Sequence, residues 1–452
     1  MQNTNRGSFG GRLGIILASA GSAVGLGNIW RFPTEVGRNG GAAFILVYLC
    51  FVFFLAMPVM VSEFVIGRAS RANTVDSYRR LAPGKPWVIV GFLGVLGGFL
   101  VLSFYSVVAG WTLHYTISSL ACQLTSDQDY GAFFSNFVSN PWQPLIYVAV
   151  FLLLTHFIVA RGVQAGIERY SKIMMPALLV IILILMSCSL SMPGSREGLQ
   201  FLLHPDFSKV TPSVVLSAMG QAFFSLSVGI GCLATYASYF QRDVPLVSSA
   251  FSVCFIDTMV AILSGFIIFP AVFSVPGVEV DAGPGLVYIT LPNVFNMAFS
   301  DVPVIGYLFS SLFYILLLLA ALTSSISMHE IDTAFIHEKF HLSRPRAAAV
   351  VTIVCLVLGA ACSLSFGPWE KIQVCDLRIF DLFDYLTAKF IMPLCSIFIS
   401  FFVGWILERK LVQNELTNDG TLRIRTARFL ILLIRWVAPV GVCIIFLNEL
   451  VS

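Results

Sequence analysis

The first long apolar segment of the chain contains the run Ala20-Gly21-Ser22-Ala23-Val24-Gly25-Leu26-Gly27-Asn28-Ile29-Trp30-Arg31-Phe32-Pro33. Three glycines followed by an asparagine and an arginine make a poor continuous helix. Each interior glycine costs about 1 kcal/mol relative to alanine, and a charged side chain is expensive at membrane depth. We therefore predict that the backbone unwinds here. Unwound backbone is tolerated in a bilayer only where protein buries it or where it lines a cavity, so this run is the first candidate for a binding site.

The composition places the chain in a membrane. Hydrophobic residues make up 57% and charged residues 11% of the 452 residues, and the mean hydropathy is +0.87, which excludes a soluble domain of this size. The net charge is only +3 and no basic run is present, so we expect no nucleic-acid partner. The ten cysteines are scattered without a CxxC pair and are interpreted as small apolar filler.

Apolar runs of about 20 residues, long enough to cross a bilayer, occur eleven times. The predicted spans are residues 11–37 (interrupted), 41–67, 88–120, 143–160, 167–190, 211–240 (interrupted), 244–275, 303–338, 346–366, 376–407 and 427–449. The segment 280–297 contains two prolines and is too broken to span. It is expected to be either a short helical lid or a plain loop.

Basic residues concentrate in alternate loops, which sets the orientation. The segment 68–85 carries five of them, whereas the loops 121–142 and 276–302 on the opposite side carry none. This alternation puts the N-terminus inside and, after eleven spans, the C-terminus outside. Residues 1–10 lack the features of a signal peptide, and we expect them to form a cytoplasmic segment.

The glycine pattern of the first span returns in the sixth. Val228-Gly229-Ile230-Gly231 repeats the form of Val24-Gly25-Leu26-Gly27, and paired glycine-interrupted spans in two halves point to a transporter built from inverted repeats. The alternative is close helix packing by small residues. A broken helix exposes N–H groups that suit a carboxylate and carbonyl oxygens that suit a hard cation. The two breaks therefore predict one shared site for an anionic group and a cation.

Three motifs make the resemblance to a known family specific. They are A-G-S-A-V-G-L-G-N-I-W-R-F-P at 20–33 followed by N-G-G-A-A-F at 39–44, G-Q-A-F-F-S-L-S-V-G-I-G at 220–231, and A-L-T-S-S-I-S at 321–327. The chain resembles the neurotransmitter:sodium symporter family from about residue 6 to the eleventh span, and specifically its bacterial amino-acid transporters with eleven spans.

The resemblance implies an all-α integral membrane protein with the LeuT-type fold. Eleven transmembrane helices would form a 5+5 inverted repeat with broken first and sixth helices. The first repeat would cover residues 11–190 and the second residues 211–407. One extra C-terminal helix would follow at 427–449.

The resemblance also implies two sodium sites formed by oxygen atoms of several spans. The first would use Ala23, Asn28, Ser225 and Asp257. The second would use backbone oxygens of Gly21, Val24 and Ala320 and the hydroxyl groups of Thr323 and Ser324. Carbonyl and hydroxyl oxygens with few formal charges fit Na⁺ better than a divalent ion.

Asp257 also stands out on its own, because an acid in an apolar span is functional by default; a structural hydrogen-bonding role is the alternative. Animal members of the family bind chloride near this point, and some bacterial members have a fixed carboxylate instead. The counterpart of that carboxylate falls at Val260 or Ala261, which are not acidic. We therefore hypothesise that Asp257 supplies the negative charge and that chloride is not required.

By the same resemblance, the substrate pocket is lined by residues of the first, third, sixth and eighth spans. They are Ser22, Ala23, Gly25, Leu26, Gly27, Val101, Tyr105, Phe224, Ser225, Ser227, Ile230, Ser324 and Met328. Relatives that carry monoamines place an aspartate at the position of Gly25, so glycine favours a substrate that keeps its carboxylate. The apolar end at Val101, Ile230 and Met328 suggests room for a large side chain; helix packing is the alternative for each of these three.

The family resemblance further implies gates. Outside the site, Arg31 would pair with an acid of the tenth span, which matches Asp384, with Asp381 as the fallback. Tyr105 and Phe224 would form an aromatic gate below that pair.

On the inner side, Arg6 would pair with Glu338, supported by Tyr239; two solvated charges are the alternative. Gly166 and Pro176 flank nine residues of the fifth span. A proline breaks the helical hydrogen-bond ladder, so this pair could form a hinge that unwinds, or a static kink.

The sequence thus predicts a sodium-coupled symporter that imports a hydrophobic or aromatic L-amino acid by alternating access, and not an enzyme. A proton-coupled carrier of the same fold is the nearest alternative, and a non-transporting sensor remains open. The six histidines show no metal-ligand spacing. We expect an amino-acid substrate and membrane lipid as partners, no obligate protein partner, and a location in the bacterial cytoplasmic (inner) membrane.

Overall fold

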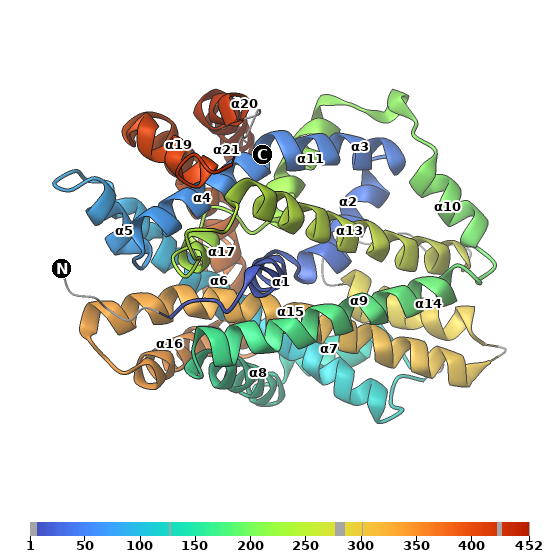
Figure 1. The fold of residues 1–452 in the computed structure, drawn as a ribbon. Helices are drawn as coiled ribbons and strands as arrows, with labels where there is room; N and C mark the ends of the chain where they lie inside the picture. The colour runs from blue at the N-terminus through green and yellow to red at the C-terminus, as the bar shows by residue number, and fades with distance from the viewer. Residues whose placement is uncertain (1–6, 126–127, 276–284, 301, 423–426, 452) are drawn as a thin grey trace.

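The computed structural model describes residues 7–125, 128–275, 285–300, 302–422 and 427–451, and it is a bundle of helices (Figure 1). Nine helices in this described part are long and apolar enough to cross a membrane. A tenth candidate is the pair Arg12–Ala23 and Gly27–Arg38, which bends by 59° at its break. The predicted all-helical membrane fold is therefore confirmed, with an interrupted first span.

The long helices make up most of the chain, and short helices connect them. The α-helices are α1 (Arg12–Ala23), α2 (Phe32–Arg38), α3 (Ala42–Phe51), α4 (Met57–Ser70), α5 (Thr74–Leu81), α6 (Val88–Leu120), α7 (Tyr130–Ser139), α8 (Gln143–Ala160), α9 (Arg169–Ser189), α10 (Ser195–Leu203), α11 (Pro212–Ser225), α12 (Cys232–Ala237), α13 (Leu246–Phe273), α14 (Leu291–Ala298), α15 (Pro303–Phe340), α16 (Arg344–Leu364), α17 (Ile379–Tyr385), α18 (Met392–Phe401), α19 (Arg409–Thr417), α20 (Ala427–Leu432) and α21 (Ala438–Val451).

Tighter and wider helical turns join several of these. The 3₁₀ turn is η4 (Phe207–Lys209), and the π-helical turns are η1 (Gly27–Arg31), η2 (Val52–Ala56), η3 (Val163–Glu168), η5 (Leu286–Thr290), η6 (Leu386–Ile391), η7 (Phe402–Ile406) and η8 (Leu433–Val437). Strands β1 (Gln373–Val374) and β2 (Leu377–Arg378) form an antiparallel pair. This small hairpin was not predicted, because two-residue strands carry no periodic signal in the sequence.

Side-chain caps fix where several helices begin. The Asn73 side chain accepts hydrogen bonds from the N–H groups of Val75 and Asp76 at the start of α5, and Thr211 accepts one from Val214 at the start of α11. Both residues satisfy N–H groups that have no partner within the helix. Pro212 follows Thr211 in the first turn of α11, where a missing N–H costs nothing.

The predicted second interrupted span, residues 211–240, is divided into α11 and α12, which are 14 and 6 residues long. Neither is long enough to cross a bilayer alone.

In the segment 280–297, residues 286–298 are helical as η5 and α14, which favours the predicted lid over a plain loop; residues 280–284 lie outside the described part. The helices α5, α7, α10 and α19 occupy regions predicted as loops, because the search for spans considered only long apolar runs.

The interior of the bundle is arranged around the first broken helix. α1 lies among the long helices in Figure 1 and packs against α9, α13 and α15. α6 and α15 pack along one another. These contacts bring the breaks near residues 24–26 and 226–231 together with the middle of α6 and α15, where most of the predicted site residues lie.

Candidate functional site

Three of the four residues predicted for the first sodium site form one buried hydrogen-bonded cluster. The Asn28 amide nitrogen donates to Oδ1 of Asp257 over 2.8 Å and to Oγ of Ser225 over 3.1 Å. The Ser225 hydroxyl donates to Oδ2 of Asp257 over 2.6 Å, and Tyr48 lies 3.2 Å from Ser225 through its own hydroxyl. Ala23, the fourth predicted residue, is buried at the last turn of α1. The cluster thus joins η1, α11 and α13 around one carboxylate.

The second predicted sodium site is assembled from the end of α1 and the middle of α15. The Ser324 hydroxyl lies 2.9 Å from the carbonyl oxygen of Val24 and 3.5 Å from that of Gly21. The Thr323 hydroxyl lies 3.4 Å from the Val24 oxygen and 3.0 Å from the Ala320 oxygen. All five predicted residues are therefore brought together, and they present uncharged oxygen atoms in a buried place.

The backbone of the first break is buried and lies next to both of these groups of oxygen atoms. The N–H of Leu26 points to the Tyr105 hydroxyl at 3.4 Å, and the N–H of Gly25 donates to Oδ1 of Asn28. A Cβ atom added to Gly25 would lie 2.7 Å from Oγ of Ser324, and one added to Gly27 would lie 2.7 Å from the Phe224 ring. Side chains therefore approach the break so closely that only glycine fits at both positions without a shift.

The predicted apolar end of the pocket lies next to this break. Val101, Ile230 and Met328 are all buried, with exposed fractions of 7%, 1% and 6%. Ser22 is buried as well, and its hydroxyl has no hydrogen-bond partner. Ser227 is half-buried and has a positive φ of 49°, which turns the chain after α11. The structure thus places the predicted lining residues around the two breaks.

The second break is held by a buried carboxylate of α4. Glu63 accepts hydrogen bonds from the N–H of Gly229 over 2.6 Å and from the N–H of Ala234 over 3.1 Å. It is completely buried. Glu63 therefore ties the second break to α4.

At the predicted outer gate, Arg31 contacts an aromatic ring. Its guanidinium carbon lies 4.0 Å from the centre of the Phe224 ring, a cation–π contact. Among the ion pairs of the described residues, none joins Arg31 to Asp384. The fallback residue Asp381 pairs with Arg378 over 2.6 Å. The pairing of Arg31 with Asp384 therefore stays a prediction.

At the inner end, Tyr239 donates a hydrogen bond of 2.6 Å to Glu330. Glu330 also forms an ion pair with Arg344. Glu338 accepts two hydrogen bonds from Asn73, through the backbone N–H at 3.1 Å and the side-chain amide at 2.9 Å. Arg6 lies outside the described residues. The predicted role of Tyr239 as a supporting residue thus involves Glu330, which the sequence reading did not single out.

The predicted hinge contains a π-helical turn. Gly166 lies in η3, where an added Cβ would come within 2.1 Å of the Ile158 oxygen. Pro176 lies inside α9, which is otherwise a regular helix. The structure therefore shows a wide turn at the glycine and a continuous helix through the proline.

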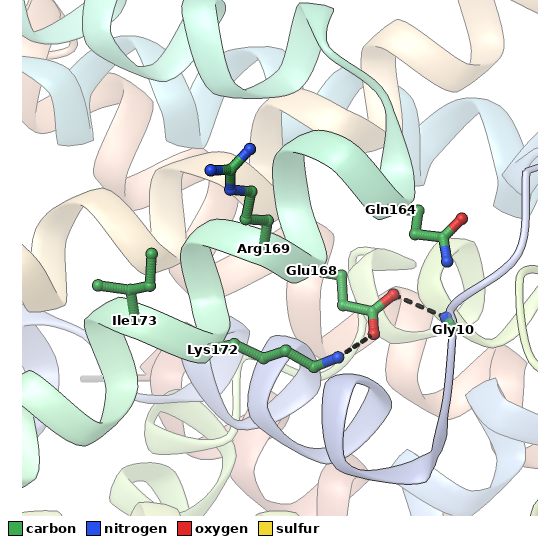
Figure 2. Close-up of a pocket in the computed structure, with 6 residues that line it drawn as sticks. All are labelled: Gly10, Gln164, Glu168, Arg169, Lys172 and Ile173. Carbon is green, nitrogen blue, oxygen red and sulfur yellow. Dashed lines mark hydrogen bonds and ion pairs between the residues drawn. The ribbon is translucent and has the colours of Figure 1, made fainter.

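A shallow pocket lies where η3 and α9 meet the start of α1 (Figure 2). Glu168 accepts a hydrogen bond of 2.7 Å from the Gly10 N–H and pairs with Lys172 over 2.6 Å. An added Cβ on Gly14 would lie 2.2 Å from the Glu168 carboxylate. The carboxylate thus lies beside the first turn of α1 and binds the residue before its N-cap position, Gly11, which makes no side-chain cap.

Three buried acids of the apolar spans or their ends were not singled out from the sequence: Glu168, Glu330 and Asp332. Each lies in or beside an apolar span, and an intramembrane carboxylate is a functional candidate by default. The same argument that identified Asp257 could therefore have found them.

Comparison with known proteins identifies the chain. The model of the "Sodium:neurotransmitter symporter family" matches residues 6–139 and 134–452. An uncharacterized sodium-dependent transporter of Bacillus subtilis (strain 168), YhdH, is 38% identical over 440 residues, covering 97% of this chain and 96% of the relative. An uncharacterized sodium-dependent transporter of Haemophilus influenzae is 32% identical over 461 residues, covering 99% of each chain. The crystal structure of MhsT in complex with L-phenylalanine superposes with a TM-score of 0.88 at 42% identity, covering 98% of this chain and 100% of MhsT.

Proposed function

This chain belongs to the sodium:neurotransmitter symporter family as a sodium-dependent membrane transporter, and we propose that it imports a hydrophobic or aromatic L-amino acid together with Na⁺. The observation that carries the proposal is the second oxygen cluster. Its carbonyl and hydroxyl oxygens come from Gly21, Val24, Ala320, Thr323 and Ser324 and lie within hydrogen-bonding distance of one another.

The chemistry of this cluster supports a monovalent cation. Hard cations take oxygen ligands, and a site without a carboxylate suits a single positive charge. The first cluster adds a second candidate cation site with one carboxylate, that of Asp257, beside Asn28 and Ser225. Two Na⁺ ions per cycle are the proposed number.

The first break supports an amino-acid substrate. The Leu26 N–H and the Tyr105 hydroxyl, which lie 3.4 Å apart across the break, are the donors that suit a carboxylate there. Position 25 is a glycine, so no acidic side chain is present there to pair with the amine of a substrate that lacks a carboxylate. The similar protein MhsT binds L-phenylalanine, and the buried apolar residues Val101, Ile230 and Met328 fit a side chain of that kind.

We also propose that transport does not require chloride. The Asp257 carboxylate is already enclosed by the Tyr48, Ser225 and Asn28 side chains, so the negative charge at this place belongs to the protein. Replacement of chloride by gluconate is expected to leave uptake unchanged. Loss of uptake in gluconate would contradict this role of Asp257.

Alternating access follows from gates at both ends. The Arg31–Phe224 contact closes the outer side, with Asp384 as the proposed further partner. The inner side is closed by the Tyr239–Glu330–Arg344 contacts and the proposed Arg6–Glu338 pair. Opening of the inner side would use the η3 turn at Gly166 and Pro176.

Ion and substrate share the residues of the breaks, so each raises the affinity of the other reciprocally.

We further propose the two repeats at residues 11–190 and 211–407 and an orientation with the N-terminus inside and the C-terminus outside. The membrane would be the bacterial cytoplasmic membrane.

The proposal is tested by uptake of labelled amino acids into proteoliposomes with and without an inward Na⁺ gradient. We expect accumulation of at least one hydrophobic or aromatic amino acid that depends on Na⁺. Uptake that follows a pH gradient and ignores Na⁺ would support the proton-coupled alternative. Ligand binding without accumulation would support the sensor.

Two threonine variants sharpen this test. Thr323→Val removes one hydroxyl from the second oxygen cluster and is expected to raise the Na⁺ concentration for half-maximal uptake at least about tenfold, because a cation loses one of its few ligands. The matched control is Thr112→Val, which removes a buried hydroxyl that bonds to Tyr288, away from both clusters. An equal effect of both variants would contradict the assignment of the site.

A further inference from the structure

Asp332 on α15 is a completely buried acid. Among the described residues, neither oxygen of its carboxylate has a hydrogen-bond partner, and no ion pair includes it. A buried polar group without a partner is rare in proteins and calls for an explanation. An acid at membrane depth is a functional candidate.

The position of Asp332 relates it to the two breaks. α6 and α15 pack antiparallel, and their residues meet in successive layers. Tyr105 of α6 and Ser324 of α15 both lie against Gly25, at 3.2 Å and 2.7 Å from the place of its missing Cβ. Gly98 of α6 lies against Asp332, since a Cβ at Gly98 would be 2.8 Å from Oδ1 of the carboxylate.

Val101 and Met328 form the layer between these two, one helical turn from each in sequence. Gly98 and Tyr105 are seven positions apart, which is about 10 Å along α6 at 1.5 Å per residue, and they lie on the same face of the helix. Asp332 is therefore about two turns below the place proposed for the substrate carboxylate, beyond the apolar walls of the pocket.

Two adjacent glycines of α6, Gly97 and Gly98, let side chains of other helices approach the α6 backbone at the level of Asp332. Gly98 leaves room for the carboxylate, and a Cβ at Gly97 would lie 3.1 Å from both Ile230 and Ile391. Ile230 is one of the proposed walls for the substrate side chain. The base of the proposed pocket thus has an apolar part, the Ile230 side chain, and the carboxylate of Asp332, whose oxygens have no hydrogen-bond partner among the described residues.

We propose that Asp332 binds the far end of the substrate's side chain, and that the preferred substrate is an L-amino acid whose apolar side chain ends in an N–H or O–H donor. This inference rests on the proposed function. Apolar walls followed by one unpaired acceptor match a side chain that is apolar along its length and polar at its tip. A neutral aromatic donor, as in tyrosine or tryptophan, and a charged donor on an aliphatic stem, as in lysine, are the two sources of this chemistry.

The experiment measures how strongly each member of a matched pair of amino acids inhibits Na⁺-driven uptake in proteoliposomes. Tyrosine is compared with phenylalanine, tryptophan with 1-methyltryptophan, and lysine with norleucine; each pair differs chiefly in the donor at the tip. We expect at least about a tenfold lower inhibition constant for the donor-bearing member, because a site built to hydrogen-bond a substrate group rejects the analogue that lacks it. A preference within the aromatic pairs or within the lysine pair identifies the source.

Two variants separate recognition from structure. Asp332→Leu is expected to bring the inhibition constants of the two members of each pair together, and Asp332→Asn, which keeps an acceptor, is expected to retain part of the preference. Na⁺-driven uptake without a donor preference in the unmodified protein would overturn this inference and leave the proposed function intact. An unchanged donor preference in Asp332→Leu would also overturn this inference and leave the proposed function intact. Should that variant fail to fold, the comparison within the unmodified protein decides alone. No Na⁺-driven uptake of any amino acid would instead defeat the proposed function and this inference with it.

Discussion

The two breaks carry the same sequence pattern, valine-glycine-x-glycine, and use their glycines for different physical reasons. At the first break, Gly25 and Gly27 have no positive φ angles. They are required because Ser324, Tyr105 and Phe224 approach the backbone closely. The first break is therefore a contact surface, against which side chains of other helices close.

At the second break, the glycines are required by backbone conformation. Gly229 and Gly231 have φ angles of 103° and 84°, which only glycine adopts readily. Glu63 then binds the N–H groups of Gly229 and Ala234. The second break is thus a fixed bend held by a carboxylate. The comparison teaches that one motif can provide space in one half of a molecule and shape in the other.

The largest expected effect comes from adding a methyl group at each break. Gly229→Ala places a side chain at a positive φ, which costs about 1–2 kcal/mol, and brings its Cβ within 2.5 Å of the Met392 oxygen, where overpacking costs about 1–3 kcal/mol. We expect a large loss of thermal stability in detergent. Gly25→Ala meets only the ends of the Ser324 and Tyr105 side chains, so it should fold with nearly normal stability and lose most of its uptake.

Thermal denaturation of both variants and their uptake in proteoliposomes check this contrast. Gly84→Ala serves as a control for positive φ alone, since its φ is 76° and an added Cβ there meets nothing within 4 Å. If Gly25→Ala were the less stable of the two site variants, the proposed difference between the breaks would be wrong.

A smaller effect is expected from Glu63→Gln. The glutamine keeps one acceptor oxygen and turns an NH₂ group toward one of the two N–H donors, which leaves a buried donor unpaired at a cost of about 1–3 kcal/mol. The backbone at the second break should open more often, and the backbone at the first break should not. Hydrogen exchange of the amides of residues 229–234 should become faster, while exchange of residues 25–28 stays unchanged. Equal acceleration at both breaks would show that they are not held separately.

The next prediction concerns the carboxylate that serves the first break. Asp257→Asn keeps the shape of the side chain and removes its charge, so the Asn28 and Ser225 hydrogen bonds lose their charged acceptor. Because a charged ligand binds a cation more strongly than an amide oxygen, we expect the Na⁺ concentration for half-maximal uptake to rise about tenfold. Thermal stability should fall less than in Glu63→Gln. An unchanged Na⁺ dependence would remove Asp257 from the first ion site.

Much of this site was predictable because its signals are local in the sequence. The glycine runs at 24–27 and 228–231 indicated the breaks, and the hydroxyl pair at 323–324 indicated oxygen ligands. The different tasks of the two glycine pairs were not predictable, because φ angles and close approaches depend on neighbours far away in the chain. Ser324 meets Val24 across 300 residues and Glu63 meets Gly229 across 166.

The short polar connections could not be predicted from span length alone. α5 begins at a cap formed by Asn73, and α7 begins at one formed by Asp129, and neither has a long apolar run. Acids in apolar surroundings were a usable signal that was applied to Asp257 and not to Asp332.

The smallest expected effect lies at the far end of the first broken helix. Glu168 accepts the Gly10 N–H and pairs with Lys172 (Figure 2), and α1 has no side-chain cap and no acid in its first turn. Glu168→Gln keeps an acceptor and removes the charge that complements the positive end of the helix. We expect a loss of about 1 kcal/mol in local stability, which corresponds to roughly fivefold faster hydrogen exchange of the amides of residues 10–16.

Glu197→Gln is the matched control, because Glu197 is an exposed acid in the first turn of α10 and does not contact α1. The Glu168 variant should also shift the protein toward the inward-open arrangement, since this contact fastens the inner half of the first broken helix to η3. In the second broken helix, the carboxylate of Glu63 lies at the break itself. The first broken helix would then be held by two carboxylates, that of Asp257 at its break and that of Glu168 at the start of α1. Equal exchange rates in the Glu168 and Glu197 variants would mean that the fastening does not limit the opening of α1, and the first helix would be held by its break alone.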